Sequence, residues 1–96
     1  MRYVSRRGIV LTDVAGEHVL IAAQRLRKEV PYITILNDTG AFCWQCLTEG
    51  TGEEELCTKI KDEFDVEDEE LMREDVASLL NQLKQKHYIQ EVNDDE

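Results

Sequence analysis

The alternation of apolar and polar positions predicts a β-rich first half and a helical second half. Residues 8–12 and 18–22 are apolar runs of β-type residues, and residues 13–17 between them contain a glycine suited to a turn. Residues 31–36 form a third run, whose aromatic and β-branched side chains favour a strand. We therefore predict a β-hairpin followed by a third strand. Because proline has no N–H to donate, Pro31 at the start of this strand indicates a strand with an open side.

Helical spacing begins directly after the third strand. The polar group Asn37-Asp38-Thr39-Gly40 interrupts the apolar run, and the next apolar residues recur every three or four positions. Either Asn37 or Asp38 can cap the first turn of this helix, because each side chain can accept a hydrogen bond from an unpaired backbone N–H. The sequence thus predicts a strand that passes into a helix within a few residues.

Two further helices are predicted, at about residues 52–64 and 68–86. Each carries an apolar stripe at helical spacing. The stripes consist of Leu56, Cys57, Ile60 and Phe64 in the first helix, and of Met72, Val76, Leu79, Leu80 and Leu83 in the second. Residues 88–92 have strand character, as a wing or as a terminal extension.

This order of elements predicts an α+β, winged-helix-like fold, in which a three-stranded antiparallel sheet is followed by three helices. The chain of 96 residues has the length of one domain. We expect residues 1–92 to form that domain and residues 93–96 to be a loose acidic tail.

The net charge of −10 is unevenly distributed. Residues 1–30 hold six Lys/Arg and three Asp/Glu and carry +3, whereas residues 31–96 hold five and eighteen and carry −13. Nucleic acid is bound chiefly by Lys and Arg that neutralise phosphates, so we expect the acidic helical half to repel it. A basic or apolar partner fits this half of the chain better.

The sequence also bears on location. No apolar run approaches the roughly 20 residues that span a bilayer, and residues 1–7 lack the apolar stretch of a signal peptide. These observations predict a cytoplasmic protein that does not bind a membrane. The three cysteines, an odd number, fit reduced thiols better than a disulfide framework.

The junction between the third strand and the first helix carries a motif. The pattern Asn37-x-Thr39-Gly40-Ala41-x-x-Trp44-x-x-Leu47 resembles the strand-to-helix signature of the PqqD-like family, the peptide-binding domains also called recognition elements of ribosomally made, modified peptides. The strands before the motif and the helices after it follow the family's order, so the resemblance covers most of the chain. It implies the same winged-helix-type arrangement, with Trp44 packed under the sheet.

The resemblance also implies a function. Similar domains hold the leader segment of a precursor peptide between the third strand and the third helix, and present the core segment to a modifying enzyme, here expected to be a radical-SAM protein. An extended leader would join the open strand edge as an added strand. The chain itself is expected to hold no cofactor or metal. The residues expected at the peptide are Tyr32, Ile33, Thr34, Ile35, Leu36, Met72, Asp75, Leu79, Gln82 and Leu83.

Each part of this site has a simpler interpretation. Every open sheet has edges, so this edge could be solvated, covered by the basic connector of residues 23–29, or paired with a second copy of the chain. The apolar stripe of the third helix could belong wholly to the core. We expect Val76 and Leu80 to be core residues and Asp75, Leu79 and Gln82 to line the groove.

The cysteines suggest two alternative sites. Cys43 and Cys46 match C-x-x-C, but a reactive pair has its first thiol at a helix N-terminus, and Cys43 lies a turn or more inside. Both fall on apolar helical positions, so core packing is the better interpretation. A zinc site made of these two residues, Cys57 and a histidine would lack the two close ligand pairs that such sites use.

No set of residues matches a catalytic or phosphate-binding motif, so we expect a protein that is not an enzyme. The alternative function is a winged-helix transcriptional regulator, since three helices and a terminal strand also describe that class. The acidic third helix speaks against it, because a recognition helix needs Arg or Lys for phosphates and base edges.

Overall fold

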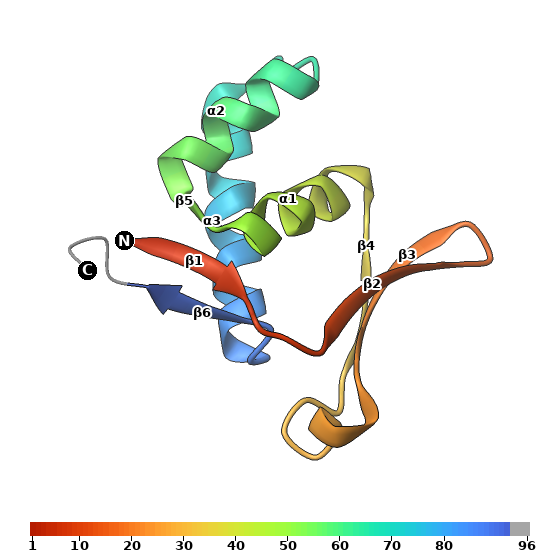
Figure 1. Cartoon of the computed structure of the whole chain (residues 1–96). Helices are drawn as coiled ribbons and strands as arrows, with labels where there is room; N and C mark the ends of the chain where they lie inside the picture. The colour runs from red at the N-terminus through yellow and green to blue at the C-terminus, as the bar shows by residue number, and fades with distance from the viewer. Residues whose placement is uncertain (93–96) are drawn as a thin grey trace.

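The computed structural model describes residues 1–92 and arranges them as three α-helices and two antiparallel three-stranded sheets (Figure 1). The predicted tail, residues 93–96, lies outside the described residues. In chain order the elements are β1 (Arg2–Ser5), β2 (Ile9–Val14), β3 (Glu17–Ala22), a 3₁₀ turn (Gln24–Leu26), β4 (Ile33–Leu36), α1 (Asp38–Glu49), β5 (Thr51–Gly52), α2 (Glu53–Glu63), α3 (Glu69–Gln85) and β6 (Ile89–Val92).

The three predicted strands correspond to β2, β3 and β4, which form one sheet in that order. The hairpin is in register from Ile9 opposite Ala22 to Val14 opposite Glu17. Strand β4 pairs with β3 alone among the strands of residues 1–92, so it is an edge strand. It begins at Ile33, two residues after Pro31.

The expectation of a single sheet is corrected by a second one, with the order β5-β1-β6. Its centre is β1, which pairs with β5 through Arg2 and Tyr3 and with β6 along its whole length. The sequence does not reveal this sheet because β5 has only two residues and β1 contains no apolar run of β-type residues. The extension predicted at residues 88–92 is β6, and it pairs with the start of the chain.

The start of α1 lies close to the end of β4, and two residues cause this. Asn37 is the N-cap: its Oδ1 accepts a hydrogen bond from the Gly40 N–H at 2.7 Å, which satisfies one unpaired first-turn donor. A Cβ atom at Gly40 would lie 3.2 Å from Asn37 Oδ1 and from Leu36 Cβ. Glycine at this position therefore lets the helix begin directly against the strand.

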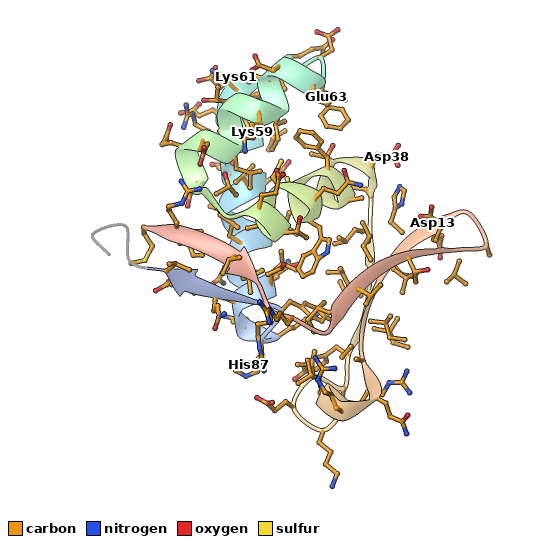
Figure 2. The ribbon with its side chains drawn as sticks, in the orientation of Figure 1. Asp13, Asp38, Lys59, Lys61, Glu63 and His87 are labelled. Carbon is orange, nitrogen blue, oxygen red and sulfur yellow. The ribbon has the colours of Figure 1, made fainter. Side chains whose placement is uncertain are left out.

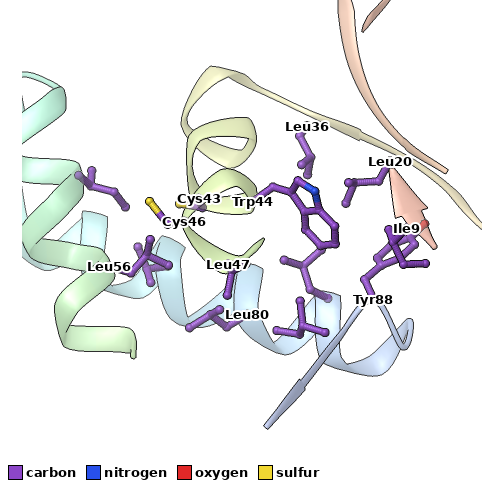
Figure 3. Close-up of a cluster of buried hydrophobic side chains, with 14 of the residues drawn as sticks. Ile9, Leu20, Leu36, Cys43, Trp44, Cys46, Leu47, Leu56, Leu80 and Tyr88 are labelled. Carbon is purple, nitrogen blue, oxygen red and sulfur yellow. The ribbon is translucent and has the colours of Figure 1, made fainter. Parts of the chain in front are cut away.

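The core lies where α1 packs between the sheets and the other two helices. Trp44 of α1 is buried and meets Tyr88 edge to face, with ring centroids 6.5 Å apart. Figure 3 shows the Trp44 ring between α1 and the side chains of Leu20 and Leu36. Among the described residues, no helix combines the length and the apolar character needed to cross a membrane.

His18 links the hairpin to the start of α1. Its Nδ1 lies 2.8 Å from Asp13 Oδ1 on β2, and its Nε2 lies 2.8 Å from Asp38 Oδ1 on α1. Figure 2 labels both carboxylates on the same side of the molecule. The pKa of His18 is raised, first by the hydrogen bond to Asp38 and then by the one to Asp13.

Asp38→Asn is expected to lower the pKa of His18 toward its ordinary value of 6.5, and to do so more than Asp13→Asn. Because the folded-state pKa is raised, the bridge stabilises the fold fully below the ordinary pKa and loses this contribution as the pH rises through the folded-state pKa. An NMR titration of the imidazole C–H shifts measures the pKa in each variant. Equal pKa values in the wild type and both variants would contradict the bridge.

Candidate functional site

The free edge of β4 can be assigned residue by residue from the hydrogen-bond alternation of the sheet. Neighbouring residues in a strand direct their N–H and C=O groups to opposite sides. The Ala23 N–H donates to the Gly8 C=O at 2.6 Å, one pair beyond the end of the β2–β3 ladder. The Ala23 N–H thus faces β2. Because the direction alternates along β3, the backbone groups of Leu20 and His18 face β4.

Leu20 lies opposite Thr34, and His18 lies opposite Leu36. Thr34 and Leu36 therefore direct their backbone groups toward β3. By the same alternation, the N–H and C=O groups of Ile33 and Ile35 point away from β3. These four groups form a pairing edge for a further strand.

A pocket of about 530 Å³ lies beside β4, with α3 as its other wall. Parts of α1, of α2 and of the α2–α3 connection complete it. Its lining consists of Thr34, Ile35, Leu36, Asn37, Thr39, Gly40, Cys43, Ile60, Phe64, Asp65, Val66, Met72, Asp75, Val76, Leu79 and Gln82. The volume falls within the range of ligand-binding pockets, roughly 300–1,000 Å³.

Hydrogen bonds from the C-terminal end of α3 hold the first half of β4. Thr34 Oγ1 lies 2.9 Å from the Tyr88 hydroxyl, and Lys86 Nζ donates to the same Oγ1 at 3.4 Å. Lys86 Nζ also lies 5.8 Å from the centre of the Tyr32 ring. With the Asn37 cap at the other end, both ends of β4 are fixed to helices.

The charged groups that line the pocket are acidic. Asp65 lies in the α2–α3 connection and Asp75 on α3, and both side chains are exposed. No Lys or Arg of residues 1–92 is part of the lining. The pocket therefore combines an apolar floor with carboxylates that suit a basic side chain of a ligand.

The structure brings together seven of the ten residues predicted at the peptide. The seven that line the pocket are Thr34, Ile35, Leu36, Met72, Asp75, Leu79 and Gln82. Tyr32 and Ile33 lie on the same segment but outside the lining, with exposed side chains. Leu83 is 1% exposed and belongs to the core, so the structure does not place it at the pocket. Val76 and Leu80 are buried, and Val76 also lines the pocket.

Sequence reasoning missed the end of the pocket nearest the start of α3. There Phe64, Asp65 and Val66 line it, and Phe64 meets Phe42 edge to face at 5.4 Å. These residues directly precede the third helix in the sequence, so they lie at its N-terminal end. If that helix walls the pocket, its sequence neighbours could have been placed at the same end of the pocket. Asn37 and Thr39 had a similar signal, since they follow the edge strand.

The structure leaves all three cysteines as free, buried thiols. Cys43 lies at the pocket floor without exposed surface, and burial raises its pKa to about 12. A thiol in this environment is not a thiolate near neutral pH, which argues against redox chemistry. Within residues 1–92, no group of three or more His, Cys, Asp or Glu residues is placed to hold a metal ion.

Comparison with protein families identifies the class. The model of the family described as coenzyme PQQ synthesis protein D (PqqD) matches residues 17–89, which is most of the chain. The chain therefore belongs to the PqqD family. The matched region includes β4, α3 and every residue of the pocket lining. A comparison with curated proteins found no match.

Two solved structures have the same fold. One is described as TbiB1 in complex with the TbiA(β) leader peptide; it is 24% identical, the match covers 95% of this chain and 99% of that chain, and the TM-score is 0.70. The other is described as lasso peptide synthetase B1 complexed with the leader peptide, with 21% identity, coverage of 93% and 98%, and a TM-score of 0.69.

Alanine variants of Leu79 and Leu83 test which face of α3 packs in the core. Leu83→Ala is expected to lower the free energy of unfolding by about 2–5 kcal/mol, because it leaves a cavity at a fully buried position. Leu79→Ala is the matched control and should cost clearly less, since Leu79 is only partly buried. Urea denaturation followed by circular dichroism measures both. A larger loss for Leu79→Ala would reverse the assignment of the two faces.

Proposed function

We propose that this protein is a non-catalytic adaptor that binds the leader segment of a ribosomally made precursor peptide and presents the peptide to a modifying enzyme. The observation that carries the proposal is an edge strand whose outer backbone groups have no strand partner within residues 1–92, beside a pocket walled by α3. Membership of the PqqD family supports it. So does the shared fold with two proteins whose structures contain leader peptides.

The leader adds to β4 as a further strand. Its backbone pairs with the N–H and C=O groups of Ile33 and Ile35, and alternate side chains point toward the pocket. Side chains two residues apart lie about 6.6 Å from each other in a strand. The Leu79 side chain lies between Asp75 and Gln82 in the pocket lining and receives an apolar anchor of the peptide.

The acidic lining favours a leader with basic residues beside its apolar anchors. Asp75 is the candidate contact, because its carboxylate is exposed on the wall that faces β4. The attraction between exposed charges is screened by salt over about 10 Å at 0.1 M, so the affinity falls as the ionic strength rises.

The partner enzyme acts on the peptide while the adaptor holds the leader. Tethering raises the local concentration of the core segment at the active site without contacts to the reacting atoms. The sequence resemblance suggested a radical-SAM enzyme, whereas one of the similar structures is described as lasso peptide synthetase B1. We propose lasso peptide synthesis as the first pathway class to test and a radical-SAM enzyme as the second.

The proposal also includes the expected domain extent, fold type and location of the protein. Residues 1–92 act as one unit, since the core cluster draws side chains from β2, β3, β4, β6 and all three helices. The winged-helix-like description and the cytoplasmic location remain predictions, and the free thiols fit the latter.

A transcriptional regulator finds no support in the surface of α3. Arg73 contacts Glu54 and Glu69, and Lys84 contacts Glu91 at 2.6 Å. The basic groups of this helix are thus neutralised by carboxylates, whereas a DNA-binding helix offers them to phosphates.

An N-methyl scan of a synthetic leader tests strand addition. Methylation removes a backbone donor, and in an added strand only every second N–H faces β4. We expect the loss of affinity to alternate with a period of two residues across the segment that pairs with β4. Fluorescence anisotropy of labelled candidate leader peptides measures the affinities. A uniform loss, or no loss, would contradict pairing with β4.

Leu79→Asp is expected to weaken leader binding about tenfold or more, because it places a charge where an apolar anchor is buried. Asp75→Asn keeps the shape of the pocket and should weaken binding less, while removing part of the salt dependence. Anisotropy titrations at two salt concentrations measure both effects, and circular dichroism confirms that the variants fold. Salt-insensitive binding by the wild type would exclude the charge contribution.

A further inference from the structure

The outer face of the β2-β3-β4 sheet is apolar. Residues directly opposite one another in a sheet point to the same face, so Val10, Ile21 and Ile33 form one row across the three strands. The next row holds Thr12, Val19 and Ile35, of which Val19 is buried. The other face of the sheet, with Ile9, Leu20 and Leu36 among its residues, packs on the core.

Several of these aliphatic side chains lie open on the surface. The exposed fraction is 51% for Val10, 67% for Ile33 and 60% for Ile35. Contiguous exposed apolar surface of this kind marks interaction sites in soluble proteins. The pocket does not account for it, since Ile35 alone of the residues in these two rows also belongs to the pocket lining.

The charges around this face identify its partner. The connector that follows β3 carries three exposed cations, Arg25, Arg27 and Lys28, and one exposed carboxylate, Glu29, which pairs with Arg6. Glu17 is the single carboxylate among the described residues on the face itself. A second copy would therefore bring a surplus of positive charge against the same surplus. A basic leader is excluded for the same reason, so the charges favour a partner that is apolar with an acidic rim.

We propose that the outer face of this sheet, centred on Val10, Ile21 and Ile33, is the docking surface for the modifying enzyme, which meets it with an aliphatic or aromatic patch rimmed by Asp and Glu. The inference rests on the proposed function, since an adaptor needs a second interface besides its peptide site. Strand β4 is common to both surfaces. The leader pairs with the edge of β4 and the enzyme covers the outer side of the same strand. The two bound partners therefore lie next to each other.

The variant Val10→Asp tests this surface. Val10 lies on β2, two strands away from the pairing edge of β4, and is not part of the pocket lining. A carboxylate here should weaken enzyme binding about tenfold or more, because it enters an apolar contact and opposes an acidic rim. Lys28→Glu should weaken binding several-fold and lower its salt dependence. Val10→Thr, which keeps a β-branched side chain, provides a milder variant in case Val10→Asp does not fold.

The matched control is Leu71→Asp. Leu71 is 52% exposed on the first turn of α3, so it resembles Val10 in exposure and in the charge introduced. It lies outside the pocket lining. We expect its binding to the enzyme and to the leader to stay within about twofold of the wild type.

The experiment uses the full chain, a purified candidate enzyme and a synthetic leader of that enzyme's substrate, with separate calorimetric titrations of enzyme and leader. A lasso peptide synthesis enzyme is tested first and a radical-SAM enzyme second. Enzyme binding that is lost in the Val10 variants, with leader affinity kept, supports the docking surface. Equal enzyme binding by all variants overturns it, as does a wild type that does not bind the enzyme. Self-association by gel filtration that Val10→Asp abolishes would assign the face to a second copy and also overturn it. Failure of the leader titration alone counts against the proposed function and leaves enzyme docking measurable.

Discussion

The position of β4 depends on restraints at its two ends. At one end Thr34 is hydrogen bonded to Tyr88 and Lys86, and at the other the Asn37 cap ties the strand to α1. Because β4 has a neighbouring strand on one side alone within residues 1–92, these end contacts hold its other edge at a fixed place opposite α3. A ligand that pairs with this edge does not have to order it first, and such preorganisation lowers the cost of binding.

The sequence predicted the elements that have strong local signals. The change from β-branched residues to a capping Asn and then to helical spacing located the junction of β4 and α1 correctly, and the bounds of α2 and α3 fall within about a residue of the expected ones. It did not predict β1 and β5, because β5 has only two residues, β1 contains no apolar run of β-type residues, and both strands are formed with partners distant in the chain.

The pocket was predictable in its walls but not in its detail. Leu79 and Leu83 are four residues apart and lie on nearly the same side of α3, so spacing alone cannot separate them. The separation comes from the chain after the helix: His87 adopts a left-handed φ of 64°, and the Tyr88 N–H donates back to the Leu83 C=O at 2.9 Å. This turn brings the Tyr88 ring into the core, where Leu83 is also buried, while Leu79 remains at the pocket.

Under the proposed function, backbone pairing sets the orientation of a bound leader, whereas side chains supply most of its affinity. The two N–H and two C=O groups of Ile33 and Ile35 allow about four hydrogen bonds, each with a net contribution of about 0.5–1.5 kcal/mol. Association costs an estimated 4–15 kcal/mol in lost freedom, so these bonds alone do not hold a peptide at micromolar concentration, which requires about −8 kcal/mol. The remainder has to come from apolar anchors in the pocket and from its carboxylates. Under the same proposal, selectivity among precursors resides in the side chains of α3 and of the α2–α3 connection, because a strand edge pairs with any extended backbone.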